Sequence, residues 1–260
     1  MYNTIELEKK EKSIWIILSR EERRNALNPE MLKDLNDALS SVNEDDDVVS
    51  IVLTGAGEKA FCSGMDLGGA AAQLSPLERY EMQREFIKVL KTIKASNKPI
   101  VARVQGLALG GGFGLLSACD LVIASDNVKG GTPEINLGLF PYIIMASLIR
   151  TTNNQKALLE MMFTGEKITA YKMQELGFVN YVVKAKELDA KVAEVTEKIN
   201  KKSPAILRLG RRAYYTIRDM EYEKAMDHLS AMLAVNSQAE DMIEGVMAFM
   251  EKREPEWKGK

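Results

Sequence analysis

Cysteine and histidine are scarce in this chain of 260 residues, which contains Cys62, Cys119 and a single histidine, His228. Two cysteines this far apart match neither a metal-ligand spacing nor a disulfide framework, so we expect reduced, buried thiols and no metal. A serine or cysteine nucleophile needs a base beside it, and no histidine lies near Ser63 or Cys62 in the sequence. A Ser-His or Cys-His hydrolase is therefore not expected.

Long apolar runs and a large excess of one charge are also absent. No stretch reaches the roughly 18 apolar residues needed to cross a bilayer, and the charged N-terminal residues do not resemble a signal peptide. Lysine and arginine number 35 against 37 aspartates and glutamates, so no basic field indicates nucleic acid. We expect a cytoplasmic protein that binds neither membranes nor nucleic acid.

Strand-like and helix-like segments alternate along most of the chain. The composition, 46% hydrophobic and 28% charged, is that of a globular protein with one main domain. Short apolar runs typical of strands occupy residues 13–18, 48–53, 100–104, 121–124 and 178–183. This alternation predicts an α/β fold.

Short polar residues mark the predicted helix starts. Asn28, Ser75 and Ser203 each precede a proline, and Ser237 has Glu240 three residues later, so each is predicted to cap a helix. Gly177 is predicted to end a helix. From about residue 187 onward the pattern is helical only, and six of the chain's 14 methionines lie between residues 220 and 250. This indicates a helical C-terminal module that packs on another surface.

The segment GLALGGGFGLLSACD (106–120) places three glycines between an apolar run and a predicted helix. It is not a dinucleotide fingerprint, because position 115 is leucine, and no P-loop motif occurs. Glycines at a helix start let a ligand oxygen reach backbone amides. A second turn of this kind, GEKAFCSGMDL (57–67), could supply a partner amide for an oxyanion hole. From spacing alone, both could equally be tight connections.

Four segments together resemble the enoyl-CoA hydratase/isomerase, or crotonase, superfamily. They are ERRNALN (22–28), AFCSGMDL (60–67), GLALGGGFGLLSACDLVIAS (106–125) and TPEINLGLFP (132–141), and their order spans nearly the whole chain. The resemblance implies an α/β spiral of repeated strand-strand-helix turns over residues 1–195, with the acyl-CoA site, and a C-terminal helical trimerisation module over residues 196–260. It also implies a homotrimer or homohexamer and no cofactor beyond the coenzyme A moiety of the substrate.

The resemblance further assigns site residues. The amides of Met65 and Gly111 would form the oxyanion hole for a thioester carbonyl. A substrate-binding set would comprise Arg24, Ala26, Ala60, Ser63, Gly64, Asp66, Leu67 and Gly110. Two of these have other interpretations, because Arg24 could be a solvated arginine and Asp66 a helix cap.

Glu134 is the candidate catalytic residue. The family's hydratases use two glutamates, and here the second position holds Glu134 while the first holds Gly114. One carboxylate suffices to move a double bond, so the resemblance favours an enoyl-CoA isomerase; hydration by Glu134 with an ordered water and a non-catalytic acyl-CoA-binding scaffold are the alternatives. The apolar neighbours of Glu134 predict a raised pKa. Replacing Gly114 with glutamate would then be expected to restore hydration, and residues 142–144 are expected to form an apolar acyl pocket.

Overall fold

The structure, a computed structural model, describes residues 2–68 and 73–260. Its larger sheet has the order β1-β2-β3-β5-β7-β10, in which only β1 is antiparallel to its neighbour. These strands are β1 Ile5–Lys10, β2 Ser13–Leu18, β3 Ser50–Gly55, β5 Ile100–Val104, β7 Leu121–Ser125 and β10 Tyr181–Val183. The smaller sheet consists of β4 Ala60–Cys62, β6 Leu107–Leu109, β8 Lys129–Gly131 and β9 Ile168–Thr169.

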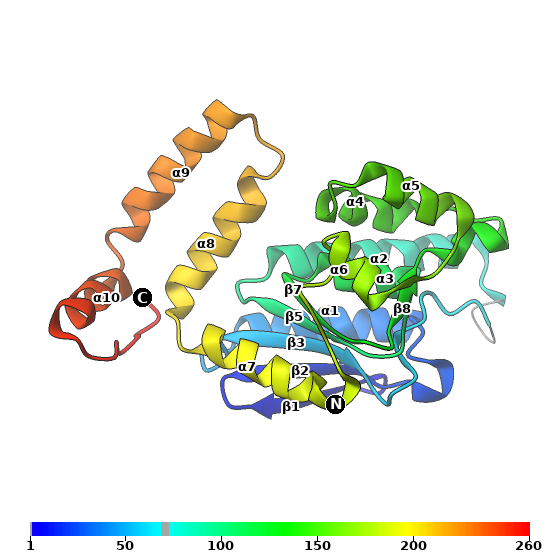
Figure 1. The fold of residues 1–260 in the computed structure, drawn as a ribbon, viewed down its shortest axis with the longest axis horizontal. Coiled ribbons are helices and arrows are strands. Elements are labelled where there is room, and N and C mark those ends of the chain that lie inside the picture. Colours follow the sequence, from blue (N-terminus) through cyan, green and yellow to red (C-terminus); the bar gives the residue numbers. More distant parts are fainter. Residues whose placement is uncertain (1, 69–72) are drawn as a thin grey trace.

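Three successive turns of the chain each add one strand to both sheets and then a helix (Figure 1). The turns are β3-β4-α2, β5-β6-α3 and β7-β8-α4, which confirms the predicted spiral of strand-strand-helix units. The helices are α1 Pro29–Asn43, α2 Pro76–Ala95, α3 Gly111–Ala118, α4 Tyr142–Thr151, α5 Gln155–Thr164, α6 Ala170–Glu175, α7 Leu188–Asn200, α8 Pro204–Ile217, α9 Tyr222–Asn236 and α10 Glu240–Glu251. Short 3-10 helices are η1 Glu21–Arg23, η3 Pro133–Leu137 and η4 Ala185–Glu187.

The parallel strands are buried on both faces, which explains their almost continuous apolar runs. In β3, Ile51 and Leu53 face a core shared with α1, α2 and α3, whereas Val52 faces α7 on the opposite side of the sheet (Figure 1). Leu188 and Val192 of α7 complete that second core. Alternate side chains of one strand therefore hold both helical layers in place.

Most predicted boundaries match the structure. The strands at 13–18 and 100–104 are confirmed as they stand, and the one at 121–124 gains a residue. The strand predicted at 48–53 begins two residues later, and only residues 181–183 of the run 178–183 are in a strand. After α6 the chain turns at Gly177, which has φ +84°, and Phe178 then packs in the core instead of continuing a strand.

Three of the four predicted helix caps are confirmed. The side chains of Asn28, Ser75 and Ser203 each accept a hydrogen bond from a backbone amide in the first turn of α1, α2 and α8. The prediction for Ser237 is wrong. Helix α9 continues to Asn236, Ser237 keeps a helical backbone at its end, and α10 begins after Ala239 without a side-chain cap.

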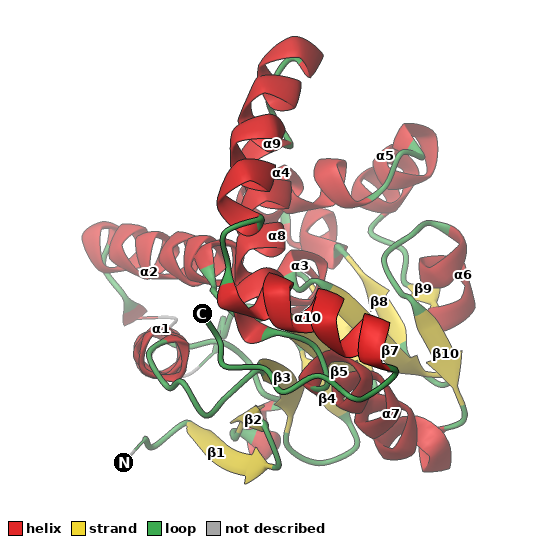
Figure 2. Ribbon diagram, turned by 90° about the vertical axis from the view of Figure 1, so that its left-hand side faces the viewer, coloured by secondary structure: helices red, strands yellow, loops and turns green. Residues whose placement is uncertain are grey.

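Helices α8, α9 and α10 extend away from the two sheets (Figures 1 and 2). Exposed apolar side chains lie on them, among them Met226, Leu233 and Phe249. With α3 and α4 they border a cavity of about 1060 Å³ that contains none of the predicted site residues. The division between residues 195 and 196 and the role of these helices in assembly stay predictions.

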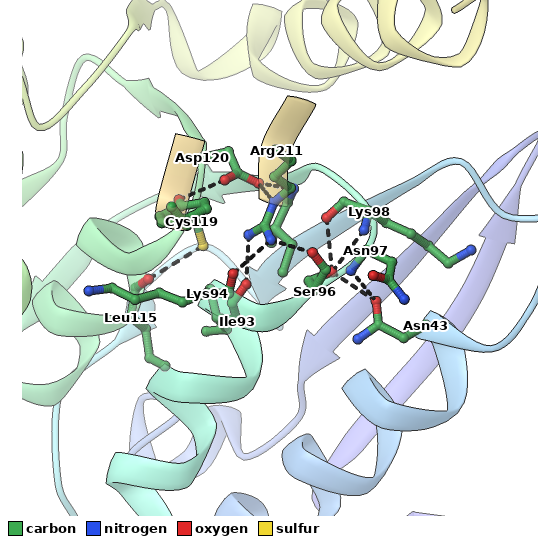
Figure 3. Close-up of polar contacts among 12 residues, drawn as sticks. Asn43, Ile93, Lys94, Ser96, Asn97, Lys98, Leu115, Cys119, Asp120 and Arg211 are labelled. Atoms are coloured by element: carbon green, nitrogen blue, oxygen red, sulfur yellow. Dashed lines mark hydrogen bonds and ion pairs between the residues drawn. The ribbon is translucent and has the colours of Figure 1, made fainter. Parts of the chain in front are cut away.

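Arg211 anchors α8 to the body of the molecule (Figure 3). Its guanidinium donates to the Asp120 carboxylate at 2.8 Å, just after α3, and to the carbonyl oxygens of Ile93 and Lys94 at 2.6 and 2.9 Å, at the end of α2. It also donates to the Ser96 carbonyl. One side chain thus joins the projecting helices to two helices of the core, α2 and α3. Nowhere in residues 2–68 or 73–260 is a helix long and apolar enough to cross a membrane.

Candidate active site

The glycine-rich turn delivers the start of α3 to a cavity. Strand β6 ends at Leu109 and α3 begins at Gly111, and between them Gly110 adopts φ +51° and ψ −120°, which glycine tolerates far better than other residues. The Gly110 amide donates to the Gly131 carbonyl of β8 at 2.9 Å, which fixes the turn to the smaller sheet. The first amides of α3 have no acceptor within the helix and are available to a ligand.

A second turn brings the amide of Met65 to the same place. Gly64 adopts φ +102°, and Leu27 holds the peptide that follows: its amide donates to the Gly64 carbonyl and its carbonyl accepts from Asp66, both at 2.8 Å. A methyl group placed on Gly111 would lie 3.6 Å from the Met65 nitrogen, so the two amides are neighbours. In the described part of the chain neither amide has an acceptor. Two free donors side by side suit an oxygen that gains negative charge.

Glu134 lies beside these amides, in η3. A methyl group on Gly110 would meet its Oε1 at 3.0 Å, which places the carboxylate against the turn that starts α3. Its Oε2 is buried and, among the described residues, has no hydrogen-bond partner. Burial raises the pKa of Glu134 above that of an ordinary glutamate, against a smaller opposing effect of a backbone hydrogen bond. The direction predicted from its apolar neighbours is therefore confirmed.

A cavity of about 590 Å³ unites these groups. Met65, Gly111 and Glu134 line it together with apolar residues of the segment that leads into α4. Tyr142, Ile143 and Ile144, the residues expected to form an acyl pocket, line it from the first turn of α4. The cavity can thus hold a polarised carbonyl at the two amides, a carbon next to Glu134 and an apolar tail.

The predicted substrate-binding set lies mostly where residues 24–26 run beside residues 60–67, a line of contact called the seam below. The Ser63 amide donates to the Arg24 carbonyl at 3.1 Å, so the segment around residue 24 runs beside residues 60–67. Ala26, Ala60 and Gly64 are buried, Ser63 and Asp66 are half-buried, and Arg24 and Leu67 are exposed. Gly110 adjoins Glu134. The structure brings the set together, and its contacts with a coenzyme remain a prediction.

The alternative interpretation of Asp66 as a helix cap concerns a segment that continues into residues 69–72, outside the described residues, and it stays a prediction. The Asp66 carboxylate accepts hydrogen bonds from the Arg20 guanidinium at 2.9 Å and from the Gly68 amide at 3.1 Å. Burial alone would raise the pKa of Asp66, but these hydrogen bonds outweigh it and hold the pKa below its ordinary value. Arg20 also donates to the Ala26 carbonyl at 2.6 Å, so the pair fastens the seam.

Sequence reasoning missed Gln83 and Phe86, which line the cavity from α2. Phe86 is 2% exposed and lies 3.5 Å from a methyl group placed on Gly111. No motif surrounds either residue, and an aromatic residue on the buried face of a helix is ordinary core. Only the packing of α2 against α3 could identify them.

Comparisons with known proteins find relatives over nearly the whole chain. The model of the family described as enoyl-CoA hydratase/isomerase matches residues 8–260. The chain is 33% identical to the crotonyl-CoA hydratase of Syntrophomonas wolfei, over 97% of this chain and 96% of that protein. It is 30% identical to the short-chain-enoyl-CoA hydratase of Clostridium acetobutylicum, over 98% and 97%. The crystal structure of an enoyl-CoA hydratase from Mycobacterium smegmatis superimposes with a TM-score of 0.94 at 33% identity, covering 98% of this chain and 99% of that one.

Proposed function

This chain belongs to the enoyl-CoA hydratase/isomerase family and is an enzyme, and from that premise we propose that it shifts the double bond of an enoyl-CoA. Glu134 acts as the single acid and base, and the amides of Met65 and Gly111 bind the thioester oxygen. The observation that carries the proposal is the buried Glu134 Oε2, which lacks a partner within the described residues and belongs to the cavity that both amides line.

The reaction follows from this arrangement. Glu134 removes a proton from C2 of a 3-enoyl-CoA, the electrons of the C2–H bond form a C1=C2 bond, and the carbonyl π electrons move onto the thioester oxygen. The C3=C4 bond is unchanged in this dienolate. The same carboxyl group then returns the proton to C4: the carbonyl re-forms, the C1=C2 electrons become the C2=C3 bond, and the C3=C4 electrons form the new C4–H bond of the 2-enoyl-CoA.

The two amides stabilise the charge that develops on the thioester oxygen, and the environment of Glu134 adjusts the strength of the base. One amide donor to an oxyanion is worth on the order of 3 kcal/mol in a protease in which it was removed. The raised pKa of Glu134 brings the base closer to the acidity of its carbon acid. A proton shift of this kind changes no net oxidation state, so we propose no cofactor beyond the coenzyme A moiety and no metal.

Hydration of a 2-enoyl-CoA is the second candidate, because several relatives are named hydratases. In that reaction Glu134 would activate an ordered water that adds to C3. Position 114, where the family's hydratases carry the first of their two glutamates, holds glycine here. We favour isomerisation because Glu134 is the one carboxylate among the described residues that line the cavity.

The test is a proton NMR time course with a trans-3-enoyl-CoA in deuterated water. Isomerisation predicts conversion to the 2-enoyl product and deuterium at C2 or C4. Glu134→Gln should lower turnover by about 100-fold or more while a thioester analogue still binds, whereas the exposed Glu166→Gln serves as a control and should keep full activity. A 3-hydroxyacyl product from wild type would favour hydration, and binding without conversion or exchange would favour a scaffold.

Assembly and location complete the proposal. We propose a homotrimer or homohexamer formed through α8 to α10, supported by the exposed apolar side chains of these helices. Light scattering coupled to gel filtration measures the mass directly. A cytoplasmic location stays a prediction for cell fractionation.

A further inference from the structure

We propose that Ile144 is a specificity-determining residue that keeps the enzyme from adding water. Its side chain fills the space beside residue 114, from which a second carboxylate or a water held by one would reach the substrate. The inference rests on the proposed function, because it explains why Glu134 acts without a second acid or base.

Residue 114 faces the reacting groups. Gly111 and Gly114 are three residues apart on α3 and share one face of that helix, and the Gly114 amide donates to the carbonyl of Gly110, just before the helix, at 2.9 Å. Gly111 lines the cavity and Gly110 abuts the Glu134 carboxylate. A side chain on residue 114 would therefore point toward the same region.

Ile144 occupies that position. It lies in the first turn of α4 and is 3% exposed, and it lines the cavity, while Gly114 behind it does not. A β-carbon placed on Gly114 would lie 2.1 Å from Cγ2 and 2.8 Å from Cβ of Ile144. Real β-carbons essentially never approach another atom within 3.0 Å, so these two positions cannot both carry a side chain of ordinary size.

The wall beside Ile144 is hydrocarbon. The Phe86 ring lies 3.7 Å from a β-carbon placed on Gly114, so an aromatic and an aliphatic side chain meet there. A bound water needs two to four polar partners, and neither side chain provides one. A proton taken by Glu134 is thus returned to carbon, since among the described residues this wall offers neither an acid nor the polar partners that would hold a water.

This geometry changes the expectation for the simplest variant. Gly114→Glu alone cannot place its side chain without displacing Ile144 or separating α3 from α4. Restoring a second carboxylate therefore requires that residue 144 lose its side chain at the same time. Gly114→Glu/Ile144→Gly meets this condition, and Gly114→Gln/Ile144→Gly is its matched control of equal size without an ionisable group.

The experiment offers a 2-enoyl-CoA to wild type and both double variants and measures the ratio of 3-hydroxyacyl to 3-enoyl product by NMR. The inference predicts that Gly114→Glu/Ile144→Gly raises this ratio about 100-fold, the low end of what a placed acid or base contributes. The glutamine control and Ile149→Ala, an exposed change on the same helix, should leave the ratio within about twofold. An unchanged ratio in a folded glutamate variant overturns the inference.

A thermal unfolding cycle tests the contact without reference to the reaction. Gly114→Ala should lower the melting temperature in the wild-type background but not in the Ile144→Gly background, because Ile144 alone of the described residues overlaps the added methyl group. Equal effects in both backgrounds overturn the inference even if the glutamate variant misfolds. Absence of isomerisation and deuterium exchange in wild type, together with a hydration gain in the glutamate variant, overturns the proposed function but supports the role of Ile144.

Discussion

Arg211→Met should detach the projecting C-terminal helices from the core. Arg211 is 9% exposed and donates to Asp120 and to carbonyl oxygens at the end of α2 (Figure 3). Methionine reaches about as far as the Arg211 Nε and has no donor, so it replaces the aliphatic stem of Arg211 and removes every one of these hydrogen bonds. Asp120 would keep only the Ile100 amide and the Tyr215 hydroxyl as donors in the described chain.

The expected loss is large because the ion pair is buried. The side chains of Arg211 and Asp120 are 6% and 18% exposed, which is far from the solvated state of a surface pair. Removing one partner of a buried pair costs about 3–5 kcal/mol, since it leaves a charge without compensation. The unfolding equilibrium constant should therefore rise roughly a hundredfold to several thousandfold.

Urea denaturation followed by circular dichroism measures this loss, at one fixed protein concentration because subunit association adds to apparent stability. Arg150→Met is the matched control, since the Arg150–Asp219 pair is 34% and 67% exposed and should contribute about 1 kcal/mol or less. If the two variants lose the same free energy, Arg211 does not anchor α8 in the way described.

Three further predictions concern pH, thiol reactivity and capping. Burial raises the pKa of Glu134, so the contribution of Glu134 to wild-type stability is present at low pH and is lost as pH rises through the folded-state pKa. Glu134→Gln should therefore become more stable relative to wild type between about pH 4 and pH 8. A difference in urea midpoints that stays constant over this range would contradict this. Burial raises the pKa of Cys62 to about 12 and also raises that of Cys119. Neither thiol should therefore react with a disulfide reagent until the protein is denatured. Rapid labelling of either thiol in the native protein would refute this. Ser75→Ala, which breaks a capping box, should cost about 1 kcal/mol in urea denaturation, whereas Ser237→Ala should cost less than about 0.5 kcal/mol; equal losses would contradict this assignment.

Local patterns predicted most elements because the forces that form them act within a few residues. A cap needs one side chain and the amides that follow it, so Asn28 and Ser75 are recognisable without any tertiary contact. The cap prediction for Ser237 was wrong because it, too, rested on local sequence alone. Its spacing to Glu240 fits a capping box, but the hydrogen bonds of α9 continue to Ser237, and nothing local distinguishes the last turn of one helix from the start of the next.

Part of the candidate site could be predicted from the sequence because the backbone conformations that it requires are determined by residues close in sequence. Glycines at residues 64 and 110 permit positive φ angles and let a ligand approach the backbone closely, and both are visible in the sequence itself. Their meeting depends on Leu27, nearly forty residues before Met65, and could be expected only from the family resemblance. Gln83 and Phe86 carried no signal of their own.

The sequence by itself determined which groups are available: one glutamate in an apolar segment, two glycine-rich turns, and a glycine where a second carboxylate could have stood. Only the tertiary structure decided what those groups face. Ile144 and Gly114 are thirty positions apart, and their interlocking follows from the close packing of α4 on α3, which no local pattern encodes. Interior packing is dense enough that the space left by a missing side chain is filled by a neighbour, and the identity of that neighbour is a property of the folded chain alone.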